Sequence, residues 1–102
     1  MSLLHTVAKS PFERDALASC LDRSLPGAAI LLYEDGVYGA LKGGRFAERL
    51  TEAAKTRGLY VLGPDLKARG IGDDKLIAGV TVVDYPGFVD LAVRHRAVQA
   101  WC

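Results

Sequence analysis

The sequence has little of what several classes of site require. Its 102 residues include two cysteines, Cys20 and Cys102, which form neither a CxxC pair nor a metal-ligand spacing. Thirteen Lys and Arg residues nearly balance twelve Asp and Glu residues, giving a net charge of +1. No apolar run approaches the ~20 residues that a membrane span needs. We therefore expect no structural disulfide, no metal site, no membrane contact and no direct nucleic-acid binding driven by charge.

Motifs for common cofactors and nucleophiles are also missing. Lys42-Gly43-Gly44-Arg45 lacks the spacing of a P-loop, no GxGxxG follows the first expected strand, and there is no GxSxG elbow. We expect no cofactor. The first five residues lack the basic region and long apolar core of a secretory signal. This pattern predicts a cytoplasmic protein whose thiols are kept reduced.

The composition is that of a packed domain. Half of the residues are hydrophobic and 25% are charged. The length fits one domain spanning residues 1–102. A domain of this size buries a modest fraction of its surface, so association with other chains would add stability. The sequence is therefore typical of a subunit of a larger assembly.

Short apolar runs alternate with helical periods along the chain. We expect strands at residues 2–7, 28–33, 59–62 and 80–83. Helices are expected at residues 11–23, 45–57, 64–69 and 85–95, with a shorter helical segment at 37–41. Strands separated by helices predict an α/β fold, a three-layer sandwich with a mostly parallel sheet of about four strands.

Two helix boundaries have specific signals. Ser10 can cap the first helix, with Pro11 at the first helical position and Glu13 completing a capping box. Gly58 stands where the C-cap of the helix at 45–57 belongs. The first of these signals also bears on function, because a helix N-terminus can hold an anion.

The segment after the first strand is a candidate anion site. His5, Lys9 and Ser10 precede an expected helix N-terminus, whose free backbone N–H groups could bind an anion. The alternative is that Ser10 already caps those groups and that His5 packs within the sheet. Ser10 and Glu13 account for the local pattern without a ligand, which favours the alternative.

Cys20 is the one internal thiol and a candidate sulfur carrier. It lies in a row with Phe12 and Ala16 at i, i+4 and i+8, and a thiol in such a row is most often an inert core residue. The C-terminal half of a helix disfavours a thiolate, although Arg23 would favour one. Packing and reactive roles both remain open. Cys102 is read as incidental.

Three segments together resemble the DsrH/TusB family across nearly the whole chain. Their residues are His5-Thr6 with Ser10-Pro11-Phe12; the run from Leu31 to Val37 with that from Asp65 to Gly70; and Asp84-Tyr85, Phe88-Val89, Leu91, Val93, His95 and Trp101. The resemblance implies a cytoplasmic α2β2γ2 heterohexamer with DsrE- and DsrF-like, or TusD- and TusC-like, subunits. Such complexes relay persulfide sulfur to a DsrC- or TusE-like acceptor.

The resemblance also implies which role this chain has. In DsrE and TusD subunits the carrier cysteine follows a strand and shortly precedes a basic-glycine sequence. The comparable residues 62–65, ahead of Arg69-Gly70, contain no sulfur. The resemblance therefore implies that this chain is a non-catalytic or accessory subunit, in which Cys20 is an accessory sulfur carrier. TusB members carry an apolar residue at that position, so Cys20 favours the Dsr branch and intracellular sulfur oxidation.

Several other functions stay open. The alternative within the family is a TusB-like role in 2-thiolation of the tRNA wobble uridine. Outside that role, the chain could be a sulfurtransferase in its own right through Cys20, a small anion-binding domain through His5 and Lys9, or a homo-oligomeric structural protein.

Overall fold

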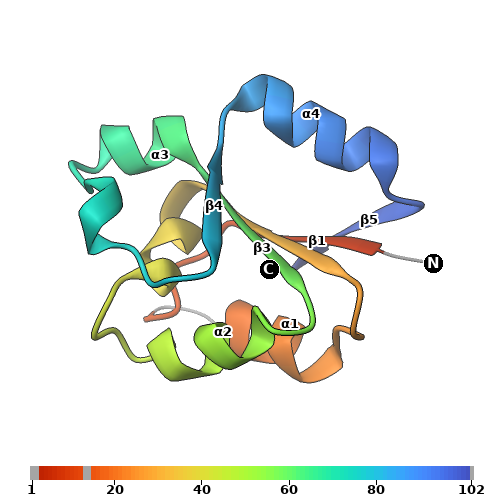
Figure 1. The fold of residues 1–102 in the computed structure, drawn as a ribbon, viewed down its shortest axis with the longest axis horizontal. Helices are drawn as coiled ribbons and strands as arrows, with labels where there is room; N and C mark the ends of the chain where they lie inside the picture. The colour runs from red at the N-terminus through yellow and green to blue at the C-terminus, as the bar shows by residue number, and fades with distance from the viewer. Residues whose placement is uncertain (1–2, 13–14, 102) are drawn as a thin grey trace.

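A parallel β-sheet lies in the middle of the computed structural model, which describes residues 3–12 and 15–101 (Figure 1). The strand order is β4-β3-β2-β1-β5, and every neighbouring pair is parallel. The strands are β1 (Leu3–Val7), β2 (Ala29–Leu32), β3 (Gly58–Leu62), β4 (Val80–Val83) and β5 (Ala97–Trp101). The expected α/β class with a parallel sheet is confirmed, with five strands in place of about four.

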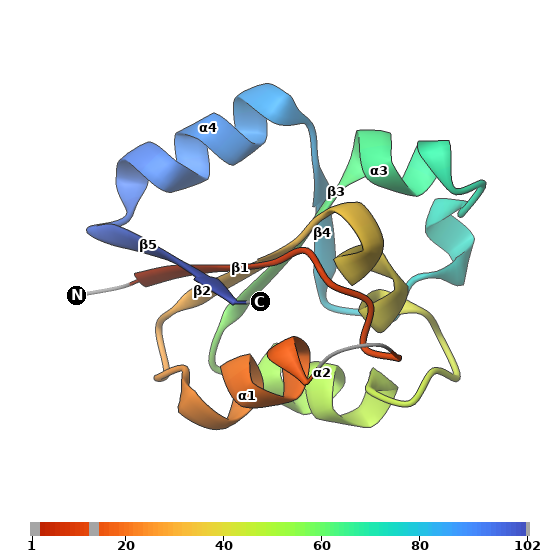
Figure 2. The same ribbon diagram turned by 180° about the vertical axis from the view of Figure 1, so that it is seen from behind.

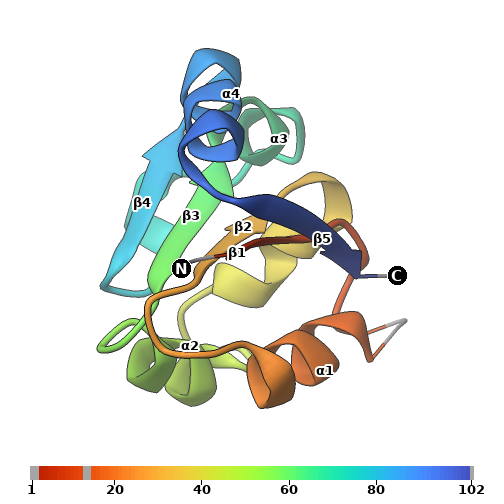
Figure 3. The same cartoon turned by 90° about the vertical axis from the view of Figure 1, so that its right-hand side faces the viewer.

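Helices cover both faces of the sheet. α1 (Ala16–Arg23) and α2 (Ala47–Ala53) lie together on one side, and α4 (Tyr85–Arg94) crosses the other (Figures 2 and 3). α3 (Gly63–Ala68) lies next to the 3₁₀ helix η1 (Glu34–Ala40), and a second 3₁₀ turn, η2, spans Asp73–Lys75. Within the described residues no helix is long and apolar enough to cross a bilayer.

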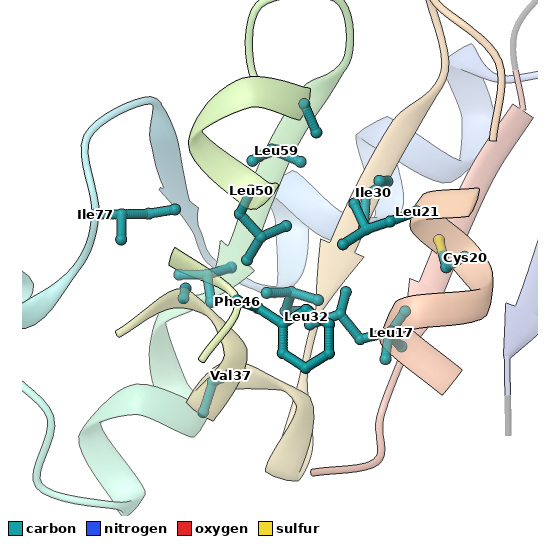
Figure 4. Close-up of a cluster of buried hydrophobic side chains, with 14 of the residues drawn as sticks. Leu17, Cys20, Leu21, Ile30, Leu32, Val37, Phe46, Leu50, Leu59 and Ile77 are labelled. Carbon is teal, nitrogen blue, oxygen red and sulfur yellow. The ribbon is translucent and has the colours of Figure 1, made fainter. Parts of the chain in front are cut away.

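Two hydrophobic cores lie on the two faces. Successive residues of a strand point to opposite faces, so Ile30 and Leu32 of β2 join one core while Ala29 and Leu31 join the other. All four β2 residues are buried, as the continuous apolar run predicts for a strand covered on both sides. The large core, under α1 and α2, includes Leu17, Cys20, Leu21, Phe46 and Leu50 (Figure 4). The small core, under α4, centres on Leu4, Ala29, Leu31 and Leu91.

The structure corrects two predicted helix boundaries. α1 begins at Ala16, whereas Pro11 and Phe12 form a turn, so the predicted N-cap at Ser10 is wrong. Pro11 and the Ser10 hydroxyl stabilise this turn, since the Phe12 N–H donates to Ser10 Oγ (3.2 Å). Glu13, the other half of the expected capping box, lies outside the described residues. Gly58 is the first residue of β3 and no C-cap, because α2 ends earlier, at Ala53.

The remaining elements agree with their patterns. α3 ends before Gly70, whose φ of +68° is the left-handed conformation that glycine adopts beyond a helix end. α4 begins after Asp84, whose side chain accepts a hydrogen bond from the Gly87 N–H (2.8 Å) as an N-cap. His95 follows α4, and its Nδ1 lies 2.6 Å from the Leu91 carbonyl oxygen near the helix end. Among the described elements, β5 and the short 3₁₀ turn η2 had no counterpart in the expected set.

Candidate functional site

Cys20 lies on the inner face of α1, within the large core. Its neighbours on that face, Leu17 and Leu21, point into the same cluster (Figure 4). The side chain is 0% exposed. Ser24 closes the end of this helix by donating its N–H to the Cys20 carbonyl oxygen (2.9 Å). Ala16, one turn before Cys20 in the row that suggested packing, is buried as well. Phe12, the third member of that row, precedes α1 and is 64% exposed, so the packing prediction is confirmed for Ala16 and Cys20 and wrong for Phe12.

Burial decides the protonation state of this thiol. Loss of hydration raises the pKa of Cys20 to about 12, and the positive charge of Arg57 offsets only part of that effect. At neutral pH the group is a thiol, and the thiolate is the form that attacks sulfur. The accessory-carrier role of Cys20 stays a prediction, and in this conformation the sulfur is neither ionised nor accessible.

His5 lies in the middle of β1 and faces the α1 side of the sheet. It is 4% exposed, and its Nδ1 accepts a hydrogen bond from Trp101 Nε1 (3.0 Å). Burial, followed by the charge of Arg57, lowers the pKa of this imidazole. His5 is therefore neutral at pH 7, with its proton on Nε2 because Nδ1 is an acceptor.

The three residues of the candidate anion site have different surroundings. His5 bonds to Trp101 on the neighbouring strand β5, while the Ser10 hydroxyl accepts from the Phe12 N–H. Lys9 is exposed. The helix N-terminus expected beside them is several residues further on, at Ala16. An anion site at His5, Lys9 and Ser10 stays a prediction, without the helix N-terminus that motivated it.

A network of polar residues occupies the carboxyl ends of β2 and β3. Asp65, in the first turn of α3, accepts the backbone N–H of Glu34 on its Oδ2 (2.6 Å). Arg69 Nη2 pairs with Asp35 Oδ1 at 2.8 Å, and Arg69 Nη1 donates to the Asp65 carbonyl oxygen (3.1 Å). The turn after β2 is thus fastened to α3 by a carboxylate and a guanidinium.

Backbone segments approach each other closely at this end of the sheet. Glu34 has a φ of +48°, a left-handed conformation that costs energy in a non-glycine residue. A Cβ atom at Gly36 would collide with the carbonyl oxygen of Val7. The Gly36 N–H instead approaches β1 and donates to the Ala8 carbonyl oxygen (3.0 Å). Residues 34–36 are therefore a structural connection between β1, β2 and α3.

A pocket that the sequence did not reveal lies between β5 and the segment that follows α1. Its volume is about 320 Å³. Apolar side chains, among them Leu25, Pro26 and Trp101, line it together with the polar residues His5, Arg23 and Gln99. We call it the edge groove. It escaped prediction because two of its lining residues, Gln99 and Trp101, belong to the unexpected strand β5. The β-favouring Val98 and Trp101 after a helix end were a usable signal for that strand.

The described part of the chain contains no cluster of metal-ligating side chains. No group of three or more His, Cys, Asp or Glu side chains is arranged there to hold an ion. The groups that could take part in other chemistry are the thiol of Cys20 and the imidazole of His5, whose pKa values are shifted by burial. The ion pairs of Arg69 with Asp35 and Asp65 form the third such group.

Comparison with known sequences gives consistent matches over the chain. The family described as "DsrH like protein" matches residues 9–98. Protein TusB of Pectobacterium parmentieri is 40% identical over 99 residues, covering 97% of this chain and all of the relative. Protein TusB of Klebsiella pneumoniae (strain 342) is 41% identical with the same coverage.

Two solved structures share the fold. The ychN protein of E. coli superposes with a TM-score of 0.80 at 20% identity, covering 98% of this chain and 99% of its own. Protein MTH1491 of Methanobacterium thermoautotrophicum gives a TM-score of 0.76 at 14% identity, with 96% of each chain covered. At these identities the likeness concerns the fold alone.

Proposed function

Because the chain belongs to the DsrH/TusB family, we propose that it is the small, non-carrier subunit of a cytoplasmic sulfur-relay complex. Its partners would be DsrE- and DsrF-like or TusD- and TusC-like subunits, two copies of each, with a DsrC- or TusE-like protein as the sulfur acceptor. The carrier thiols belong to those partners. This chain supports the assembly and offers binding surface to its partners.

The main support for a subunit that does not itself carry sulfur is the burial of Cys20. In persulfide relay an acceptor thiolate attacks the outer sulfur of a persulfide, and the inner sulfur leaves as a thiolate. Both partners must reach the sulfur, and the leaving group must be stable as an anion. Cys20 is 0% exposed with a pKa raised to about 12, so neither condition holds for it.

The polar network at the carboxyl ends supports the same role. The stretch comparable to the carrier position of DsrE and TusD subunits is residues 62–65, which form the junction of β3 and α3. Here Asp65 uses its carboxylate to hold the Glu34 N–H. This stretch contains no sulfur, and its carboxylate is engaged in the fold, which favours a supporting function.

The test compares complexes that differ only at the thiols of this chain. Cys20→Ser places a hydroxyl in the core at a cost of about 1–3 kcal/mol if it finds no partner, and assembly with two partner chains offsets part of that cost. Sulfur transfer to the DsrC- or TusE-like acceptor is then measured for the unaltered, Cys20→Ser and Cys102→Ser complexes. We expect all three to transfer most of their sulfur. A Cys20→Ser complex that assembles normally and transfers almost none would make Cys20 an essential carrier.

Of the two branches, the names of the relatives favour the Tus branch. The full-length relatives at 36–41% identity are named TusB, a name associated with 2-thiolation of the wobble uridine. The reading as a Dsr subunit of sulfur oxidation rests on Cys20, which here is a core residue. Deleting the gene and measuring 2-thiouridine in tRNA separates the branches, because loss of the modification with normal sulfur oxidation assigns the Tus role.

A further inference from the structure

β5 forms an open edge of the sheet. Among the described strands it pairs with β1 alone, so the backbone N–H and C=O groups on its other side have no strand to bond. Four of its five residues are exposed, and Val98 is 50% exposed. Residues 97–101 contain no charge and no proline, which are the features that normally prevent a strand from joining an edge.

The edge groove lies directly beside this strand. Gln99 and Trp101 of β5 form one wall, and Leu25, 73% exposed, stands on the other side. Trp101 is held in place by its hydrogen bond to His5, so this wall is preformed. An open strand beside an apolar pocket is the arrangement by which a sheet binds an added strand, with backbone bonds for affinity and the pocket for one side chain.

The charge around the groove is positive. Arg23 lines it, and the charge of Arg57 acts on the pKa of His5 within it. Arg57 donates to the Ser24 hydroxyl (2.8 Å), a neutral partner. Among the described residues, neither arginine forms an ion pair with a carboxylate. An acidic side chain near the groove would therefore be attracted to it.

We propose that β5 and the edge groove bind an extended segment of a partner subunit, which adds a sixth strand to the sheet. The segment places an apolar side chain in the groove and an acidic side chain beside Arg23. The inference rests on the proposed function in one respect, since it takes the occupant from the relay complex.

Hydrogen exchange tests the site directly. Strand addition protects backbone amides of the edge, so exchange at residues 97–101 should slow at least about tenfold in the assembled complex relative to the chain alone. Amides of β4, the opposite edge, serve as the internal reference. A complex that forms while residues 97–101 exchange as in the free chain would overturn this inference and leave the proposed function intact. Failure of the chain to co-purify with relay subunits would overturn both.

Matched substitutions on the two edges test the energetics. Val98→Lys adds a charge to β5, and Val82→Lys adds the same charge to β4, where Val82 is 38% exposed. We expect Val98→Lys to weaken association with the partner subunits about tenfold or more, and Val82→Lys to change it less than about twofold. Equal effects of the two variants would contradict the inference.

Two further variants separate binding from folding. If Val98→Lys lowers the unfolding midpoint, Leu25→Lys replaces it, because Leu25 lies in a loop and touches the groove without altering the strand. Arg23→Glu reverses the charge at the groove and should weaken association, with its loss greatest at low salt. Protection of residues 97–101 in the isolated chain at high concentration would identify a second copy as the occupant and overturn the assignment to a partner subunit.

Discussion

The two faces of the sheet are built on different scales. Under α1 and α2, 17 buried residues of the described chain form one cluster, whereas four form the cluster under α4. The outward side of α4 also exposes Tyr85, Val89 and Val93, spaced four residues apart. The large core therefore carries the stability of the fold and encloses the thiol, while the α4 side is a thin layer that can open separately.

Truncating one leucine in each core gives the largest expected effect. Leu50→Ala in α2 should cost about 3–5 kcal/mol of unfolding free energy, because a side chain with 0% exposure leaves a cavity among rigid neighbours. Leu91→Ala in α4 should cost about 2–3 kcal/mol, since its smaller cluster collapses more easily. Urea unfolding of both variants measures the difference. Equal costs would show that the two faces contribute alike.

The pH dependence of stability tests how dry the large core is. The folded thiol of Cys20 keeps its proton to about pH 12, whereas an unfolded thiol loses it near pH 9.0. The unfolded state therefore binds fewer protons in this window, and stability falls as the pH rises through it, by at most about 1.4 kcal/mol per pH unit. Cys20→Ala lacks this contribution. We expect the unaltered chain to lose stability faster than Cys20→Ala between pH 9 and 11, and parallel curves would indicate a hydrated thiol.

Removing the N-cap of α4 examines the thin side alone. Asp84→Ala deletes the acceptor of the Gly87 N–H and should cost about 1 kcal/mol. Because α4 contacts a small core, hydrogen exchange should accelerate in residues 85–94 and stay unchanged in α2. Asp84→Asn, which retains an acceptor oxygen, is the matched control. Uniform acceleration in both helices would mean that the faces unfold together.

Trp101→Phe tests the margin of the large core and has an effect of similar, small size. It removes the donor to His5 Nδ1 and should cost about 0.5–1.5 kcal/mol. Since that bond favours the neutral imidazole, its loss should raise the pKa of His5 toward its ordinary value. In the unaltered chain the lowered pKa makes stability fall as the pH drops below about 6.5, and this fall should be weaker in the variant. Proton NMR titration of the two histidines measures the shift.

The buried centre of the fold and the edge strand β4 were predictable from the sequence, whereas the edge strand β5 and the start of α1 were not. β2 was predictable because both of its faces are apolar, and α4 because its helical pattern begins near Tyr85-Pro86. β5 carries a weak pattern, since an edge strand has one neighbour and tolerates Gln99 and Ala100 in exposed positions. The start of α1 was misplaced because Ser-Pro-Phe also suits a turn, and nothing local distinguishes the two.

The candidate site also has one part that the sequence predicts and another that it does not. The interior position of Cys20 follows from helical spacing, which places it in a row with Ala16. The partner of His5 is 96 positions away, and no local pattern indicates a contact at that distance. The edge groove depends on the same long-range pairing, so it emerges only from the folded sheet.

The pairing of β5 with β1 also implies an order of events in folding. Bringing Trp101 to His5 closes a loop of nearly the whole chain, and both the entropy of closure and the rate of folding depend on such separations. Trp101 is the only tryptophan, so its fluorescence reports when this last edge closes. In stopped-flow refolding we expect the fluorescence change to lag behind the circular dichroism of the helices. The chain would thus carry its own optical marker for the completion of the sheet.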